Sequence, residues 1–364
     1  MKPALSTNSA YVAAVDIIRI VAITGVVLIH VANPIHSRTD FLGGTTWWTT
    51  NLLVSFSRVS IPLFIMLSGF LILQKQESLQ ETLRRMLTRL FIPYTFWFLI
   101  HVRWNAGHPD LAVFDASTLS AYLVGGSYHL YFLVILIGLY AVAPVIRKYL
   151  QNTSSRIQSE FLYFSLLVGI GLIALEYFAH QCTGTLFTRW VPFTGFFIAG
   201  HLLGMHQVEI SKKKLASILF VSWGMVALFS FYNMKQVLVG NSIWQPLGCL
   251  TPYFEHYLSP LVVMMSISFF ILFFHYKYAF ITNHQRLGKL IRLVARLSFG
   301  IYLTHLIVID LVDITFHLGI NSFLVPLPFY IPLKLAVVFV ISGVISFLLL
   351  KFPLTRPLLG EKIQ

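Results

Sequence analysis

The sequence predicts an all-α polytopic membrane protein with about ten transmembrane helices and with both termini in the cytoplasm. Of its 364 residues, 57% are hydrophobic and only 11% are charged, and the mean hydropathy is +0.78. Soluble domains carry about 25% charged residues, so this chain has too little polar surface to coat a water-facing body. Apolar runs of about 20 residues, the length that crosses a hydrocarbon core as a helix, recur along its whole length.

Ten apolar runs are recognised, and in chain order they are 11–33, 51–73, 90–105, 128–147, 160–179, 189–207, 214–233, 257–276, 297–317 and 328–351. The third run is the shortest and carries His101 and Arg103 near its end. Stretches between runs, such as 106–127, are too short for a separate soluble domain. Residues 1–364 are therefore expected to form a single membrane domain.

The charge distribution predicts the sidedness. Lys and Arg outnumber Asp and Glu by 26 to 13, and membrane proteins collect such cations in their cytoplasmic loops. With a cytoplasmic N-terminus, 19 of the 26 cations fall in inner loops and tails, 4 in outer loops and 3 within runs. Topology thus explains the net charge of +13, and no nucleic-acid partner is expected. The cations within runs are Arg19, Arg58 and Lys334, of which Lys334 is expected to snorkel to the outer surface.

The first run carries a polar stripe. Ionisable side chains within membrane helices are costly and by default mark functional sites. Arg19 and His30 are eleven residues apart, which puts them on one side of a helix and about 16 Å apart along its axis. Asp16, three residues before Arg19, is expected to pair with it. Taken singly, Arg19 is equally well explained by snorkelling and His30 by an interfacial hydrogen bond, but their shared side favours a functional role.

The second run and the loop after it contain four more arginines of interest. Arg58 lies about 10 Å below the outer surface, so it needs an anionic or hydrogen-bonding partner inside the bundle. In the loop, Arg84 precedes Arg85, which is four residues from Arg89 on an expected short cytoplasmic helix. These three form a cluster suited to phosphate. The requirement for cytoplasmic cations explains the cluster equally well.

Two later runs carry histidine. The segment YHLYFL puts His129 at the outer start of the fourth run, followed by Tyr131, and SFGIYLTH puts His305 near the middle of the ninth. A histidine at mid-depth is either functional or structurally paired, and the sequence does not separate the two.

The two cysteines, Cys182 and Cys249, both fall in predicted outer loops. In an oxidising compartment they would pair, but free small residues explain them as well. Neither has the spacing of metal ligands, and no metal site is expected.

Together these segments resemble the acyltransferase 3 family of integral membrane O-acyltransferases. The family signature is Arg-x10-His in the first transmembrane helix, as in Arg19 to His30. The segments SRVSIPLFIMLSGFLIL, YHLYFL and SFGIYLTH resemble its PLFF-x-x-SG-[FY], HLWFL and S-x-GIY-x-x-H motifs in the same order. The similarity covers almost the entire chain. Two departures are the spacing Arg85-x3-Arg89, where the family often has Arg-x-x-Arg, and Tyr131 in place of a frequent Trp.

The resemblance implies transfer of an acyl group, usually acetyl from cytoplasmic acetyl-CoA, to a hydroxyl of a cell-surface glycan or lipid-linked saccharide at the bacterial cytoplasmic membrane. Within the family, the chain resembles the short members that acetylate bacterial surface glycans, such as the O-acetyltransferase of enterobacterial common antigen. Arg19 and the three loop arginines would hold the nucleotide end of CoA. His30 would act as general base or acyl carrier, and Arg58 would stabilise the oxyanion. Acetyl-CoA is then a cosubstrate, and no bound cofactor is expected.

Two other classes of protein fit the same polar residues. In a secondary transporter or glycan flippase, Arg19, Arg58, His305 and Asp310 would line a substrate or proton path. A structural subunit of a polysaccharide export machine would carry out no reaction and would tolerate replacement of His30. The identity of the sugar and the choice between acetyl and succinyl donors stay open from the sequence.

Overall fold

The computed structural model describes residues 9–106, 129–180, 185, 187–206, 208–240, 251–276, 278–316 and 327–361. These residues form a helical bundle with no strand among them. Within them, eight helical segments are long and apolar enough to cross a membrane. The prediction of an all-α polytopic membrane protein is confirmed.

In chain order the helices are α1 (Ser9–His36), α2 (Thr45–Ser57), α3 (Ser60–Leu73), α4 (Leu79–Met86), α5 (Ile92–Ala106), α7 (Tyr131–Gln151), α8 (Ser155–Phe178), α9 (Thr194–Met205), α10 (Lys212–Leu238), α11 (Pro260–Phe274), α12 (Ala279–Asn283), α13 (Gln285–Phe316) and α14 (Leu327–Lys351). Between them lie the short turns η1 (Thr39–Phe41), η2 (Leu87–Phe91), η4 (Val191–Phe193) and η5 (Tyr253–Glu255), of which η2 is a π-helix. The turn η6 (Arg356–Leu359) follows α14.

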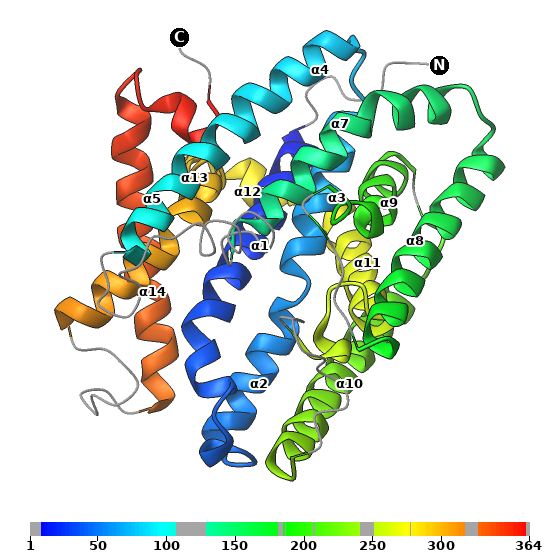
Figure 1. Ribbon diagram of the computed structural model, residues 1–364. Coiled ribbons are helices and arrows are strands. Elements are labelled where there is room, and N and C mark those ends of the chain that lie inside the picture. Colours follow the sequence, from blue (N-terminus) through cyan, green and yellow to red (C-terminus); the bar gives the residue numbers. More distant parts are fainter. Residues whose placement is uncertain are drawn as a thin grey trace.

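Eight of the ten predicted runs coincide with the eight long apolar segments. The other two are shorter helices. Run 90–105 corresponds to the 15 residues of α5, and run 189–207 corresponds to η4 with α9, Val191–Met205. The beginning of α1 and the turn η6 lie at the same end of the bundle (Figure 1), as an even number of crossings requires. The number of ten crossings and the cytoplasmic termini stay predictions.

The second predicted run is two helices rather than one. Helix α2 ends at Ser57 and α3 begins at Ser60, and Arg58 and Val59 form a turn between them. Pro62 explains the break, because its nitrogen has no hydrogen to donate to the carbonyl of Arg58 four residues earlier. The buried Arg58 side chain therefore projects from a break in the helix.

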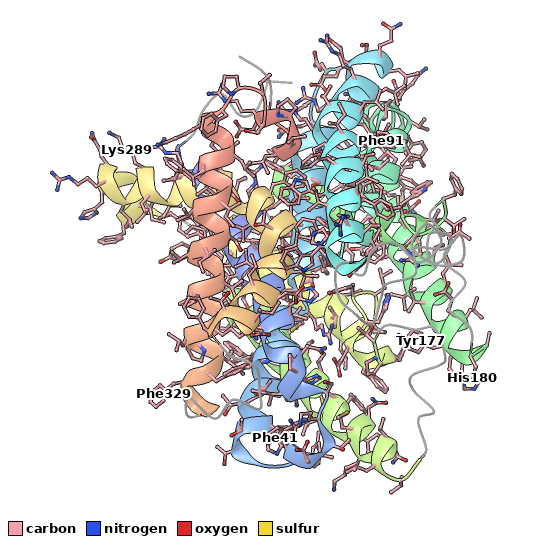
Figure 2. All side chains as sticks on the ribbon, turned by 60° about the vertical axis from the view of Figure 1, so that its left-hand side comes forward. Phe41, Phe91, Tyr177, His180, Lys289 and Phe329 are labelled. Atoms are coloured by element: carbon pink, nitrogen blue, oxygen red, sulfur yellow. The ribbon has the colours of Figure 1, made fainter. Side chains whose placement is uncertain are left out.

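Helix α1 lies inside the bundle, where it packs against α2, α3, α11, α13 and α14. The outer surface is covered instead by large apolar side chains such as those of Phe91 and Phe329 (Figure 2), as expected of a surface that faces lipid. Polar side chains of α1 such as those of Asp16 and His36 are consequently buried among other helices. At the neighbouring contact of α3 with α9, a Cβ atom on Gly69 would lie 1.8 Å from the carbonyl oxygen of Phe197, so the two backbones touch directly.

The prediction that Lys334 snorkels is wrong. Its side chain is 1% exposed, and its ammonium group donates to Asp313 Oδ2 at 2.8 Å and to the Tyr330 hydroxyl at 3.1 Å. A buried cation is tolerated when a carboxylate and further hydrogen bonds compensate it. Asp313 is 21 positions away and meets Lys334 only because α13 and α14 pack together.

Candidate active site

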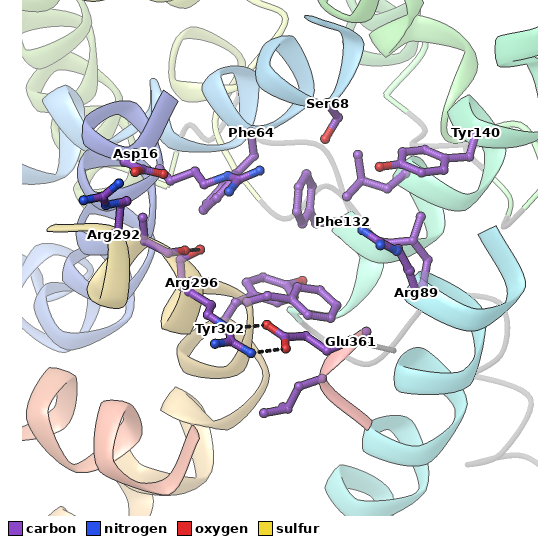
Figure 3. A pocket seen from close by; sticks show the side chains of 18 residues that line it. Asp16, Phe64, Ser68, Arg89, Phe132, Tyr140, Arg292, Arg296, Tyr302 and Glu361 are labelled. Carbon is purple, nitrogen blue, oxygen red and sulfur yellow. Dashed lines mark hydrogen bonds and ion pairs between the residues drawn. The ribbon is translucent and has the colours of Figure 1, made fainter. Parts of the chain in front are cut away.

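A cavity of about 340 Å³ lies between α1, α3, α7 and α13, at the end of the bundle where α1 begins, and is closed on one side by η6 and the residues after it (Figure 3). Small-molecule sites have volumes of this order. Four guanidinium groups line it, and they belong to Arg19, Arg89, Arg292 and Arg296. Among the described residues, two carboxylates, those of Asp16 and Glu361, face them, so the cavity suits an anionic ligand.

Arg19 and Asp16 both reach this cavity from α1. The expected ion pair between them is not formed, since neither residue belongs to an ion pair within the described part of the chain. The two charges still act on each other, and Arg292 acts on Asp16 from α13. The Arg19 guanidinium therefore faces the cavity without a carboxylate in direct contact.

Arg89 reaches the cavity from the π-helix η2. Pro93 has no amide hydrogen for the carbonyl of Arg89 four residues earlier, and the helix widens at this point, as often happens at functional sites. The C-terminal segment packs against the same carbonyl. A Cβ atom on Gly360 would lie 2.6 Å from this oxygen, and Gly360 has a φ of +69°, so only glycine lets the segment close over the cavity.

The three predicted loop arginines are not brought together. Arg84 is exposed on α4, and Arg85 is hydrogen-bonded and ion-paired with Glu77. Only Arg89 lines the cavity. The short helix itself is present as α4, whose first turn is capped by Ser78.

Helix α13 supplies two arginines that the sequence analysis attributed to topology. Arg292 and Arg296 lie one turn apart, and Figure 3 shows them on the side of the cavity opposite Arg89. Arg296 donates two hydrogen bonds to the Glu361 carboxylate, at 2.6 and 2.5 Å, and this ion pair holds the pKa of Glu361 below its ordinary value. In the sequence, the spacing of four residues between Arg292 and Arg296 was the signal that could have indicated a shared site. Arginines in cytoplasmic loops show the same spacing for reasons of topology.

Four histidine rings from four parts of the chain form a cluster further along α1 and α13. The ring of His30 on α1 lies 5.2 Å from that of His305 on α13. His305 lies 5.5 Å from His129, which precedes α7, and His129 lies 4.3 Å from His101 on α5. The last three are buried, whereas His30 is partly exposed. Sequence reasoning had noted His101 only as a polar residue in a short run.

Tyr302 connects the cavity with the histidine cluster. It lines the cavity, and its ring lies 6.0 Å from the rings of both His129 and His305. Its hydroxyl donates to the backbone carbonyl of His129 at 2.5 Å. The wall of the cavity is therefore also in contact with the cluster.

Arg58 has the buried anionic partner that its depth predicted, and this partner is Glu255 of η5. The other Glu255 oxygen accepts from Ser230 Oγ at 2.7 Å, and Ser230 Oγ lies 3.1 Å from His36 Nε2. His36 Nε2 also lies 3.2 Å from Asn51 Oδ1. Glu255 was missed because it is 197 positions from Arg58 and no local pattern marks it.

The Arg58 guanidinium is also close to the histidine cluster. Its charge acts on His30 and on Tyr131, and Tyr257 interacts with both Arg58 and Tyr131. Arg58 Nε is buried and has no hydrogen-bond partner among the described residues. One N–H of the guanidinium thus remains available beside the cluster.

Cys182 and Cys249 lie outside the described residues, so their pairing stays an open prediction. Within the described ranges, no group of three or more His, Cys, Asp or Glu side chains is arranged to hold a metal ion.

Comparison with known protein families identifies the family to which this chain belongs. The family model described as an acyltransferase domain, that of acyltransferase 3, matches residues 12–349. Comparison with curated proteins and with solved structures gives no significant match. The matched range contains the four arginines of the cavity and the histidine cluster, and it ends before η6 and Glu361. The chain belongs to the acyltransferase 3 family and is a membrane O-acyltransferase.

Proposed function

We propose that the protein transfers an acetyl or similar short acyl group from a CoA thioester to a hydroxyl of a cell-surface glycan or lipid-linked saccharide, in the cytoplasmic membrane of a bacterium. The donor binds in the arginine-lined cavity from the cytoplasmic side. The acceptor reaches the histidine cluster from the opposite side. Membership of the acyltransferase 3 family supports the acyl transfer itself.

The proposal of a CoA thioester as donor rests on the excess of guanidinium groups over carboxylates at the cavity. Glu361 pairs with Arg296, which leaves Arg19, Arg89 and Arg292 for an incoming anion. Guanidinium groups bind phosphate oxygens in bidentate fashion, and the nucleotide end of CoA carries several phosphate groups. The 19 cations against 4 in the predicted loops support a cytoplasmic position for this end of the bundle.

Helices α1 and α13 offer a route from the phosphate groups to the reacting atoms. Arg19 and His30 share one side of α1 about 16 Å apart. Tyr302 lies between the cavity and the cluster. A pantetheine arm that extends past Tyr302 would bring the thioester carbonyl to His30.

His30 then has two possible roles. As a general base, a ring nitrogen removes the proton of the acceptor hydroxyl while the oxygen bonds to the thioester carbonyl carbon. The carbon–sulfur bond breaks, and the proton passes to the departing thiolate, which yields CoA thiol and the new ester. As an acyl carrier, the nitrogen first bonds to the thioester carbonyl carbon while the carbon–sulfur bond breaks and the CoA thiolate leaves. The hydroxyl oxygen then bonds to the same carbon while the carbon–nitrogen bond breaks, and the hydroxyl proton ends on the thiolate.

Arg58 is suited to stabilise the oxyanion that forms during either route. Its Nε–H remains unpaired within the described part of the chain, while Glu255 holds its Nη2. A fixed donor directed at such a developing charge contributes about 10²- to 10³-fold in rate.

Transfer of radiolabel tests this proposal. Purified protein is incubated with acetyl-CoA labelled in the acetyl group and with bacterial membrane glycolipid, and labelled glycolipid is measured. We expect transfer by the wild type and a loss of about 10²-fold or more for His30→Ala, because proton transfer by a positioned side chain contributes that much. Arg156→Ala is the matched control, since Arg156 is 88% exposed in an ion pair on α8, away from the cavity.

Undiminished transfer by His30→Ala would exclude His30 as base and as carrier. Movement of unlabelled glycolipid across vesicle membranes, without acyl transfer, would favour the flippase alternative. If the acyl group of CoA were hydrolysed but no glycolipid accepted it, the acceptor class would be wrong.

A further inference from the structure

His305 is the most enclosed member of the histidine cluster, with a side chain that is 0% exposed. Its ring lies between those of His30, at 5.2 Å, and His129, at 5.5 Å. The chemistry proposed above gives it no role. The surroundings of its two ring nitrogens differ, and this difference decides which of them carries the hydrogen.

The Nδ1 nitrogen of His305 is held by the backbone of its own helix. It lies 2.7 Å from the carbonyl oxygen of Tyr302 and 3.2 Å from that of Ile301. Carbonyl oxygens only accept hydrogen bonds, so Nδ1 must donate. In the neutral imidazole, Nε2 therefore carries the lone pair.

The Nε2 nitrogen of His305 is buried and has no hydrogen-bond partner among the described residues. An acceptor left unpaired in a protein interior is costly, and most buried polar atoms have a partner. His30 is the nearer of the two imidazoles beside it and the only partly exposed one. A ring N–H of His30 directed at this lone pair would satisfy it.

We propose that His305 is a positioning residue for His30, whose ring N–H it accepts at Nε2. The bond fixes the tautomer of His30 and leaves the other ring nitrogen unprotonated and directed away from His305, towards the acceptor hydroxyl. When His30 takes the hydroxyl proton, its imidazolium donates from both nitrogens, and the bond to His305 strengthens because the donor is charged. The proton then passes to the CoA thiolate, and His30 returns to its neutral form. The inference rests on the proposed function, since it assumes proton transfer by His30.

Steady-state kinetics of the full-length protein with acetyl-CoA and membrane glycolipid test this role. We expect His305→Ala to lower kcat about 10- to 100-fold, as loss of an orienting partner does elsewhere, with the KM for acetyl-CoA nearly unchanged. We expect His305→Gln to recover most of the loss, because its amide oxygen can accept near the position of Nε2. His201→Ala is the matched control: His201 lies on α9, outside cavity and cluster, and its Nδ1 also lacks a partner among the described residues.

Several results would overturn the inference. A wild-type kcat in His305→Ala, a rise in KM alone, or equal losses in the Ala and Gln variants would each exclude positioning through Nε2. If His305→Ala does not fold, the pair His305→Phe and His305→Gln replaces it, because Phe fills the space without an acceptor. A wild type that transfers no acyl group would instead defeat the proposed function, whereas active wild type with an unaffected His305→Ala defeats only the positioning role.

Discussion

Two arginines within membrane helices of this protein have opposite surroundings. Arg58 is 5% exposed and is ion-paired with Glu255. Arg19 is partly exposed, lines a cavity, and joins no ion pair in the described part of the chain. A charge that is paired in the interior is compensated before any ligand arrives, whereas a cation that faces a cavity is not. The partner of an arginine, and not its depth within a membrane run, therefore indicates its role.

The same contrast extends to the regions around the two arginines. The cavity around Arg19 has four guanidinium groups and two carboxylates, so it is built to accept negative charge. Around Arg58, a carboxylate, a serine and a histidine form a connected hydrogen-bonded set. The first region suits binding, and the second holds a cationic group in a fixed position beside His30.

The largest expected effect is the loss of stability in Arg58→Ala. Removal of one partner from a buried ion pair leaves an uncompensated charge and costs about 3–5 kcal/mol. We expect a large fall in the unfolding temperature of the purified protein in detergent. The double variant Arg58→Ala with Glu255→Ala should lose less than the sum of the single variants. Additive losses would show that the two side chains do not compensate each other.

Arg19→Ala is expected to have a smaller effect, which weakens the binding of acetyl-CoA rather than the stability of the fold. A hydrogen bond to a charged group contributes about 1.5–3 kcal/mol, and 1.4 kcal/mol corresponds to a factor of ten. We therefore expect the KM for acetyl-CoA to rise roughly 10- to 100-fold, with the unfolding temperature nearly unchanged, because no ion pair is lost. A fall in unfolding temperature as large as that of Arg58→Ala would remove the distinction between the two arginines.

The smallest effect is expected of Glu361→Gln, which releases Arg296 into the cavity. The pair is partly exposed, with 29% of the Glu361 side chain accessible, and such pairs contribute about 0.2–1 kcal/mol. We expect the KM for acetyl-CoA to fall by roughly two- to fivefold at most. An increase in KM would mean that Glu361 supports binding rather than competing for Arg296.

The pH dependence of this last effect has a defined sign. Because the pKa of Glu361 is lowered by Arg296, the ion pair is fully present above the ordinary glutamate pKa and is lost as the pH falls through the lowered value. The difference between Glu361→Gln and the wild type should therefore persist at neutral pH and disappear only in strong acid. A difference that vanished near neutrality would point to another titrating group.

Much of the fold was predictable because it depends on local pattern. Hydropathy over about 20 residues located the eight long apolar segments, and helical periodicity put Arg19 and His30 on one side of α1. The break before α3 was less predictable, since Pro62 is tolerated in membrane helices in some settings and breaks them in others. Here α2 ends at Ser57 and α3 begins at Ser60, and Arg58 in the turn between them is ion-paired with Glu255.

The sequence by itself determined the membrane class, the position of the helices and the stripe on α1, because each of these properties is carried by residues close together in the chain. Only the tertiary structure decided that Glu255 pairs with Arg58 across 197 positions, that Arg89 rather than Arg84 or Arg85 meets the cavity, and that four histidines share one cluster. Such contacts join residues on different helices. They arise from the packing of the whole bundle, and the residues of a single segment do not specify that packing.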